Sequence, residues 1–321
     1  MSDKMVTVFG GSGFLGRHVV RRLAQDGYRI IVAVRHPTDG YVLQPAGRVG
    51  QIAVVKCDIT KDADVVAAIK RADAVVNLVG ILKPGGGQDF DDVHDEGATR
   101  IATMAARAKV KRVVHVSSIG ADTEATSDYA RSKGEGEAGV LEQFPAATIL
   151  RPSIVFGPED HFFNRFASLM RMSPGVFPLF GGGRTKFQPV YVGDLAAAVS
   201  NALANDATAG KTYEIGGPMI YSFKHLLQFI AKTTERNPAW LPIPFWMLSL
   251  GAAVTGWLPF APITYDQVKL LRIDNIVRSG RDAKTVGTLA DLGVEPTAVE
   301  AIVPSYLWAF RPQGQYAEAR G

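Results

Sequence analysis

Short apolar runs alternate with amphipathic segments from the start of the chain. The first run, residues 6–9, leads into a glycine-rich stretch at 10–16, an amphipathic segment at 17–25 and a second apolar run at 30–34. This pattern predicts a βαβ unit, in which an apolar strand, a glycine turn, a helix and another strand follow one another in a short span.

Four further apolar runs continue this alternation, at residues 52–56, 74–79, 112–116 and 147–150. Strands that alternate with helical segments are typical of a doubly wound α/β fold, in which the strands form one parallel sheet. We therefore predict a Rossmann-type parallel sheet.

The chain is long enough for this domain and a second, smaller lobe. It has 321 residues, of which 47% are hydrophobic, which is enough for a full core. We expect the sheet domain to span residues 1–155, with segments near 186–217 returning to it. Residues 156–321 then form the smaller C-terminal lobe.

Composition excludes several classes of function. The 35 Lys and Arg against 31 Asp and Glu give a net charge of +4, too slight to indicate a nucleic-acid partner. The single cysteine, Cys57, cannot form an internal disulfide and favours a reducing compartment. No cluster of Cys and His has the spacing of metal ligands.

Because only residues 1–4 precede the first strand, we expect no signal or transit peptide and a location on the cytoplasmic side.

The glycine turn has the spacing of a dinucleotide-binding loop. Gly10 permits the tight turn, Gly13 lets a pyrophosphate approach the backbone, and Gly16 lets helix pack on strand. The helix N-terminus offers N–H groups to the phosphates. An ordinary glycine-rich turn is the alternative. The predicted cofactor contacts are Gly10, Gly11, Ser12, Gly13, Phe14, Leu15 and Gly16.

The second strand ends in a cation. Sites that bind NAD in this way usually place Asp or Glu there, roughly 20 residues past the glycines, to accept from the ribose 2′-hydroxyl. Arg35 occupies this place, and a guanidinium can bind a 2′-phosphate through a charge-assisted pair. We therefore predict NADPH as the cofactor. The alternative is that Arg35 is a solvated residue at the end of a strand.

The carboxyl ends of the later strands supply further candidates. Asp58 follows the third strand, where its carboxylate would accept from an adenine amino group, or would instead belong to the start of a helix at 62–70. Gly80 follows the fourth strand and allows close approach of the backbone to the cofactor. The additional predicted contacts are Ile59, Leu78, Val79, Gly80 and Ser117.

Tyr129 and Lys133 lie four residues apart after the fifth strand. This spacing puts the phenol and the ammonium on one face of a helix, where the cation is expected to lower the pKa of the phenol. Tyr129 is then a candidate proton donor or acceptor. The same spacing is a common coincidence on helices, but its place in a dinucleotide-binding fold favours function.

The glycine pattern, Ser117-Ser118, Tyr129 and Lys133 together resemble the extended and atypical short-chain dehydrogenase/reductase superfamily, over residues 4–235. The resemblance implies that Tyr129 is the acid/base and that Lys133 holds the nicotinamide ribose. It also implies that a hydroxyl after the fifth strand orients the substrate; Ser118 matches by position, with Ser117 as the alternative. A segment similar to 151–158 touches the nicotinamide in extended members, which adds Pro152 and Ser153 as cofactor contacts.

Three stretches, 8–17, 156–168 and 188–194, are similar to a narrower family, the accessory subunit of respiratory complex I called alpha-subcomplex subunit 9. In that family the bound NADPH is regarded as structural, and the subunit sits near the quinone-entry region. The resemblance implies a bacterial homologue that lies peripherally on the cytoplasmic side of the inner membrane, with other complex I subunits as partners. The alternative function is a free NADPH-dependent reductase or epimerase/dehydratase-like enzyme that uses Tyr129 and Lys133.

A long uncharged segment, 237–265, lies in the smaller lobe. Prolines interrupt it and leave 245–258 as its longest helical candidate, with Trp246 and Trp257 near the two ends. Fourteen residues reach roughly 21 Å as a helix, short of the ~30 Å hydrocarbon core. Tryptophan at both ends suits the headgroup level. We predict docking on a membrane or membrane-embedded partner; an ordinary buried helix is the alternative.

Overall fold

The computed structural model describes residues 4–85, 87–173, 175–255, 264–278 and 286–314. The chain forms two compact units, each built from three segments. Unit 1 comprises Met1–Pro152, Val192–Ile215 and Arg278–Glu295, and unit 2 comprises Ser153–Tyr191, Gly216–Val277 and Pro296–Gly321.

Unit 1 contains a seven-stranded sheet with the order β11-β6-β5-β4-β1-β2-β3, and every neighbouring pair is parallel. This confirms the predicted Rossmann-type α/β fold. The order reverses between β1 and β4, which creates the switch point where such sheets bind ligands. The strands are β1 (Met5–Phe9), β2 (Arg29–Val34), β3 (Ile52–Lys56), β4 (Ala74–Asn77), β5 (Arg112–Val116), β6 (Thr148–Pro152) and β11 (Thr212–Ile215).

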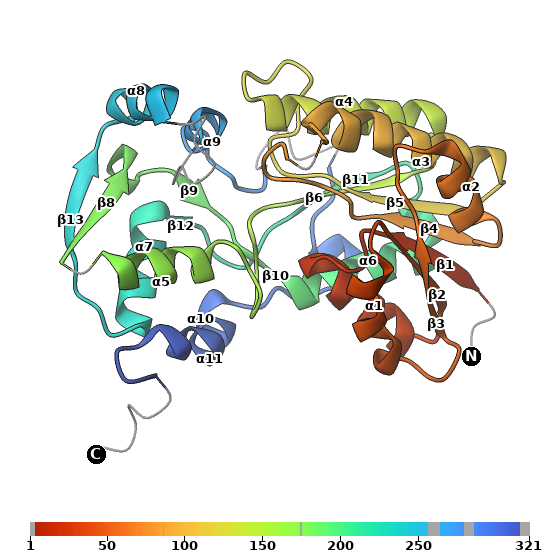
Figure 1. Ribbon diagram of the computed structural model, residues 1–321, viewed down its shortest axis with the longest axis horizontal. Helices are drawn as coiled ribbons and strands as arrows, with labels where there is room; N and C mark the ends of the chain where they lie inside the picture. The colour runs from red at the N-terminus through yellow and green to blue at the C-terminus, as the bar shows by residue number, and fades with distance from the viewer. Residues whose placement is uncertain (1–3, 86, 174, 256–263, 279–285, 315–321) are drawn as a thin grey trace. The chain divides into compact units, whose positions relative to one another are not determined.

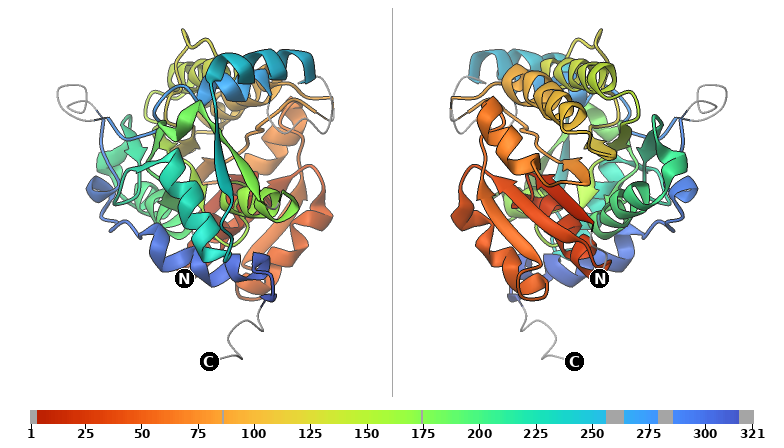
Figure 2. Two further views of the ribbon diagram at one scale, coloured as in Figure 1. Left: turned by 90° about the vertical axis from the view of Figure 1, so that its left-hand side faces the viewer. Right: turned by 90° about the vertical axis from the view of Figure 1, so that its right-hand side faces the viewer.

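Helices cover both faces of this sheet (Figures 1 and 2). α1 (Phe14–Gln25) packs beside α6 (Val192–Ala204) on one face, and α3 (Gly97–Arg107) packs between α2 (Asp62–Ile69) and α4 (Asp128–Gln143) on the other. Parallel strands buried on both faces need continuous apolar runs, as the sequence has. Shorter helical turns are η1 (Pro37–Asp39), η2 (Tyr41–Ala46), η3 (Asp91–Glu96), η5 (Asp206–Thr208) and η7 (Ala290–Leu292).

The segment 278–295 belongs to unit 1, although we assigned it to the smaller lobe from the sequence. Gly287 forms a parallel bridge with Tyr213 of β11. The Asn201 side chain donates to the Leu292 carbonyl at 2.8 Å, and Arg278 forms an ion pair with the buried Glu214 at 2.9 Å. The edge of the sheet is thus completed by residues far along the chain.

Unit 2 is held together by aromatic side chains. Phe162 and Phe223 each contact several other rings of a buried cluster that also contains Phe156, Phe163 and Phe187. Two-stranded sheets flank this core. The strands are β7 (Val155–Phe156), β8 (Val176–Phe180), β9 (Lys186–Phe187), β10 (Val190–Tyr191), β12 (Tyr221–Ser222) and β13 (Ala239–Ile243). The helical elements are α5 (Phe163–Met172), η4 (Gly181–Gly183), α7 (Phe223–Thr233), α8 (Phe245–Thr255), α9 (Tyr265–Leu270), α10 (Val299–Ile302), α11 (Pro304–Leu307) and η8 (Trp308–Phe310).

The predicted helix 245–258 corresponds to α8, which the structure describes from Phe245 to Thr255. Residues 256–258, with Trp257, lie outside the described residues. Among the residues that are described, no helix combines the length and apolar character that a membrane span requires.

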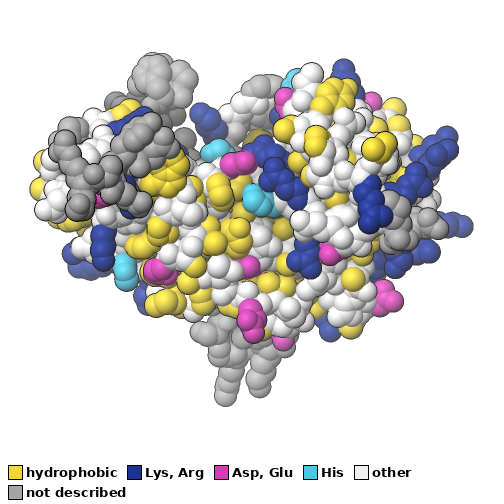
Figure 3. All heavy atoms as spheres, turned by 90° about the horizontal axis from the view of Figure 1, so that it is seen from below, with side chains coloured by type: hydrophobic (Ala, Val, Ile, Leu, Met, Phe, Trp, Pro, Cys, Tyr) yellow, Lys and Arg dark blue, Asp and Glu magenta, His cyan; other side chains and the backbone are white. Residues whose placement is uncertain are grey.

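The surface of unit 1 carries much of the positive charge. In the view of Figure 3, Lys and Arg side chains gather along its outer edge, with hydrophobic side chains scattered between polar ones. The Asp and Glu of unit 1 are as numerous as its Lys and Arg, so the net charge of +4 does not come from this unit.

Candidate functional site

The glycine turn joins β1 to α1 at the switch point of the sheet. Gly10 has φ +76°, and a Cβ there would lie 3.2 Å from the Val79 amide nitrogen. A Cβ on Gly16 would lie 2.2 Å from the Gly10 carbonyl oxygen, whereas one on Gly13 would meet only that oxygen, at 3.3 Å. The fold itself thus requires Gly10 and Gly16, while the space around Gly13 is open.

The N-terminus of α1 points its N–H groups out of this turn. Gly13 is the N-cap and supplies no side-chain cap, and the first turn of α1 contains no acidic residue. The Arg17 side chain donates to the Ser12 carbonyl at 2.7 Å, which steadies the turn. The positive end of the helix dipole is therefore available to an anion. Phe14 and Leu15 lie in this first turn, half-buried.

Arg35 is exposed at the end of β2. Its Nη1 donates to the Gln88 Oε1 at 2.5 Å, a contact across 53 residues of sequence. The guanidinium is therefore held at the carboxyl edge of the sheet by a neutral partner. This hydrogen bond therefore does not neutralise the guanidinium.

Asp58 follows β3 and lies half-buried. Its Oδ1 accepts from both the Thr60 amide and hydroxyl, at 3.1 and 2.8 Å. The N-cap of α2 is Lys61, so Asp58 does not cap that helix. Burial raises the pKa of Asp58, but the bonds from Thr60 and the charges of Lys61 and Arg35 hold it below its usual value. An ionised carboxylate thus stands near Arg35.

The loop after β4 approaches α4 closely. The Val79 amide donates to the Asn77 Oδ1 at 3.1 Å. A Cβ on Gly80 would lie 3.1 Å from the Lys133 Nζ. The missing side chain of Gly80 therefore makes room for the ammonium group.

Tyr129 and Lys133 lie one turn apart on α4, as the sequence predicts. Lys133 is buried, and burial lowers its pKa to about 8, with Glu137 opposing the shift. Burial also raises the pKa of Tyr129, which the Ser118 hydroxyl partly offsets. The expected lowering of the phenol pKa by Lys133 is therefore wrong for this structure, because desolvation dominates. At neutral pH the phenol is protonated and Lys133 is mostly cationic.

Unpartnered polar atoms lie at the end of β5. Among the described residues, Ser117 Oγ and His115 Nε2 are buried and have no hydrogen-bond partner. The side-chain amide of Asn77 donates from Nδ2 to the His115 Nδ1 at 3.1 Å. The proton of the neutral His115 ring therefore lies on Nε2. Buried donors without partners are costly, and a polar ligand placed here would satisfy them.

Two aromatic residues that we did not predict enclose Tyr129. Phe90 and His94 stack with ring centroids 5.4 Å apart, and both contact the Tyr129 ring edge-on. Nothing in the sequence pattern shows that these two side chains face Tyr129.

The family follows from this arrangement and from comparison with known proteins. Residues 6–216 match the NAD dependent epimerase/dehydratase family. This chain belongs to the NAD dependent epimerase/dehydratase family. The match covers the unit 1 sheet from the second residue of β1 to the end of β11.

The chain is also similar to curated proteins with different names. The chain is 35% identical to rat (Rattus norvegicus) NADH dehydrogenase (ubiquinone) 1 alpha subcomplex subunit 9, mitochondrial, over 94% of this chain and 78% of that protein. This confirms the resemblance drawn from the sequence. It is also 35% identical to the ceramide reductase of Caulobacter vibrioides, over 60% of this chain and 59% of that protein.

Solved structures show the same epimerase/dehydratase fold. The NADPH-dependent quinone oxidoreductase of Escherichia coli, solved with NADPH, superposes with a TM-score of 0.72, covering 95% of this chain and all of that one. Its sequence is 21% identical, so the likeness concerns the fold.

Two predicted cofactor contacts, Pro152 and Ser153, also have partners within the protein. Pro152 ends β6, and its carbonyl accepts from the Ile119 amide at 2.9 Å. The Ser153 hydroxyl lies in unit 2, 2.7 Å from the Asn275 Oδ1. The described contacts of Ser153 thus tie distant segments of unit 2 together.

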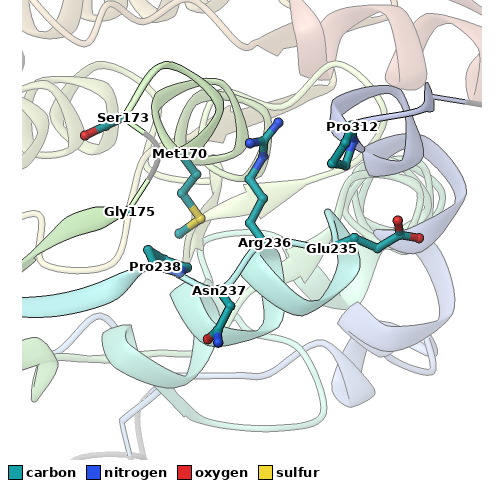
Figure 4. Close-up of a pocket in the computed structure, with 8 residues that line it drawn as sticks. All are labelled: Met170, Ser173, Gly175, Glu235, Arg236, Asn237, Pro238 and Pro312. Atoms are coloured by element: carbon teal, nitrogen blue, oxygen red, sulfur yellow. The ribbon is translucent and has the colours of Figure 1, made fainter.

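Unit 2 has a small surface pocket of about 190 Å³ that contains none of the predicted site residues. Figure 4 shows Met170 and Arg236 reaching into the space between α5 and the segment after α7, whereas Glu235 and Asn237 point away from Arg236. The Arg236 guanidinium donates to the Phe310 carbonyl at 3.2 Å. We assign this pocket no chemistry.

Proposed function

We propose that this chain is an NADP(H)-binding accessory subunit of respiratory complex I, in which the nucleotide is held and not turned over. The observation that carries the proposal is the similarity to the rat complex I subunit along 94% of this chain. The partners would be other complex I subunits near the quinone-entry region. The place would be the cytoplasmic side of a bacterial inner membrane.

The residues of unit 1 fit such a nucleotide. The open turn at Gly13 and the N-terminus of α1 would hold the pyrophosphate, and Arg35 the 2′-phosphate. Lys133, beside Gly80, would donate to the nicotinamide ribose. The orphaned Ser117 Oγ would gain a partner. NADPH is a hydride donor in enzymes, whereas in this proposal the chain would only hold the nucleotide by position and charge.

Arg35→Asp is expected to remove the preference for NADPH. Wild-type protein should bind NADPH at least tenfold more tightly than NADH, because the guanidinium pairs with the 2′-phosphate. Equilibrium titration of both nucleotides measures the ratio. Arg29→Asp, at the exposed opposite end of β2, is the control and should keep it. A wild type that prefers NADH, or an unchanged ratio in Arg35→Asp, would contradict the assignment.

A second function, an NADPH-dependent reductase, is favoured by the similarity to a ceramide reductase and by the protonated phenol of Tyr129 beside Ser118. A tyrosine in that state can donate a proton to a carbonyl oxygen as hydride arrives. The same groups also bind the nicotinamide ribose, so their presence suits both functions.

Tyr129→Phe separates the two functions. It deletes one hydroxyl, so we expect NADPH affinity to change less than about threefold, while Lys133→Ala should weaken it at least tenfold. For an accessory subunit, complex I assembly and cell respiration survive Tyr129→Phe. Copurification from gently solubilised membranes and oxygen uptake provide the measurements. Steady oxidation of NADPH by an aldehyde, ketone or nucleotide sugar, lost in Tyr129→Phe, would establish the enzyme instead.

The membrane part of the proposal concerns an apolar face on α8. Trp246 and Leu250, four residues apart on one side of this helix, are 66% and 64% exposed. Leu241 of β13 and Met247 are exposed as well. Arg272 lies beside this surface, 2.8 Å from Ser249 and over the Phe245 ring. Large apolar side chains next to a cation suit the headgroup layer of an anionic bilayer.

Trp246→Gln with Leu250→Gln is expected to release the protein from membranes. The change removes two anchors that already face solvent, so folding and NADPH retention should persist. Binding to liposomes with and without anionic lipid provides the measurement, and we expect at least a tenfold loss. Met172→Gln, an equally exposed residue on α5 (67%), is the control. Undiminished liposome binding by the double variant would exclude this face as the membrane dock.

A further inference from the structure

His94 lies at the centre of the site although the nucleotide proposal gives it no role. It belongs to the π-helical turn η3, a rare conformation that often occurs at functional sites. It is 1% exposed. A Cβ on Gly136 would come within 1.8 Å of the His94 carbonyl oxygen, so this glycine lets η3 and α4 touch.

Both ring nitrogens of His94 have defined partners. The Ile81 amide donates to Nε2 at 3.0 Å, and Nδ1 lies 3.0 Å from the Ser132 Oγ. The Ser132 hydroxyl in turn donates to the Tyr129 carbonyl at 3.0 Å. All three links lie within unit 1.

Only one assignment of donors and acceptors satisfies these three hydrogen bonds. A backbone amide can only donate, so Nε2 of His94 must carry a lone pair and Nδ1 the proton. Because the Ser132 hydrogen is committed to the Tyr129 carbonyl, Ser132 accepts from Nδ1. The chain therefore runs from Ile81 through His94 and Ser132 to Tyr129, and it requires a neutral imidazole.

The electrostatics agree with a neutral ring. Burial, with the charge of Lys133 and the nearby His115 acting in the same direction, lowers the pKa of His94 to about 2. A cationic ring would break the bond from Ile81 and repel Lys133. His94 thus stays a fixed, uncharged linker across the physiological range.

We propose that His94 is a positioning residue, which joins the loop at Gly80–Ile81 to the first turn of α4 and thereby fixes Tyr129 and Lys133 toward a nicotinamide ribose. This inference rests on the proposed nucleotide site. It does not depend on whether the nucleotide is turned over, because holding the ribose needs the same placement.

The test compares His94→Leu, His94→Gln and Ser132→Ala in the full chain. A glutamine amide can accept from Ile81 and donate to Ser132, so His94→Gln should keep NADPH affinity within about threefold. His94→Leu loses both bonds and should weaken binding at least tenfold, and Ser132→Ala about fivefold. Phe90→Leu, which removes the stacked ring but no hydrogen bond, is the control and should change thermal stability more than affinity.

A second readout needs no nucleotide. In protein with ¹⁵N-labelled histidine, the His94 signals should show the neutral Nδ1–H tautomer down to pH 5, and Ser132→Ala should shift the Nδ1 signal. A protonated ring or the opposite tautomer overturns the proposal. The proposal is also overturned if His94→Leu folds and binds NADPH as tightly as wild type. If His94→Leu does not fold, the same result for Ser132→Ala overturns it. If wild-type protein binds neither NADPH nor NADH, the proposed nucleotide site is wrong, while the tautomer still reports on the link itself.

Discussion

Gly13→Val is expected to abolish nucleotide binding while the protein stays folded. The backbone at Gly13 is extended, with φ −68° and ψ 173°, which valine adopts readily. Within 4 Å, the new Cβ would meet only the Gly10 carbonyl oxygen, at 3.3 Å. A Cβ at Gly13 therefore needs only a small shift of this carbonyl, and the side chain would occupy space that the pyrophosphate requires. We expect at least a hundredfold loss of NADPH affinity with a melting temperature within a few degrees of wild type.

Gly16→Val provides the contrast. Its Cβ would lie 2.2 Å from the Gly10 carbonyl oxygen and 2.6 Å from Gly11 backbone atoms, and backbone cannot move aside cheaply. This variant should lose stability as well as binding. Gly13→Ala should fall between wild type and Gly13→Val. If Gly13→Val binds NADPH normally, the glycine turn does not contact the pyrophosphate.

Glu137→Ala should destabilise unit 1 by about 3–5 kcal/mol. Arg151 of β6 donates from Nε to both Glu137 carboxylate oxygens, at 2.9 and 3.0 Å, and Glu137 on α4 is 4% exposed. The charge on Glu137 raises the pKa of Arg151 against the effect of burial. Removing the carboxylate leaves a half-buried guanidinium without this partner. Urea denaturation of purified protein measures the loss.

Two companion variants define this effect. Glu135→Ala, on the exposed side of α4 where Glu135 lies 3.8 Å from Arg131, should cost less than about 1 kcal/mol. Combining Glu137→Ala with Arg151→Met removes both charges and should recover much of the lost stability. A loss below about 1 kcal/mol for Glu137→Ala alone would show that water reaches the pair.

The parts of the site that depend on local chain geometry were predictable. The glycine turn and the spacing of Tyr129 and Lys133 follow from residues that are neighbours on one turn or one helix. The position of Arg35 follows from the end of an apolar strand. Each of these predictions needs only the period of a helix or strand.

The remaining features depend on contacts between distant segments. His94 meets Ile81 and Ser132 only because η3 packs on α4 at Gly136, and no periodicity shows this. The direction of the Tyr129 pKa shift depends on burial, which spacing does not reveal. Residues 278–295 join unit 1 through an isolated bridge to β11 and two side-chain contacts, and such a pairing is too short to leave an apolar run.

The order in which unit 1 is completed has a consequence for synthesis of the chain. β6 ends at Pro152, but its outer neighbour β11 begins at Thr212, and Arg278, the ion-pair partner of Glu214, comes later still. During translation at ~5–20 residues per second, the outer edge of β6 has no neighbouring strand for several seconds or longer. Unpaired edges invite association with other chains. A nascent chain stalled between β6 and β11 is therefore the form of this protein most exposed to aggregation and to capture by chaperones.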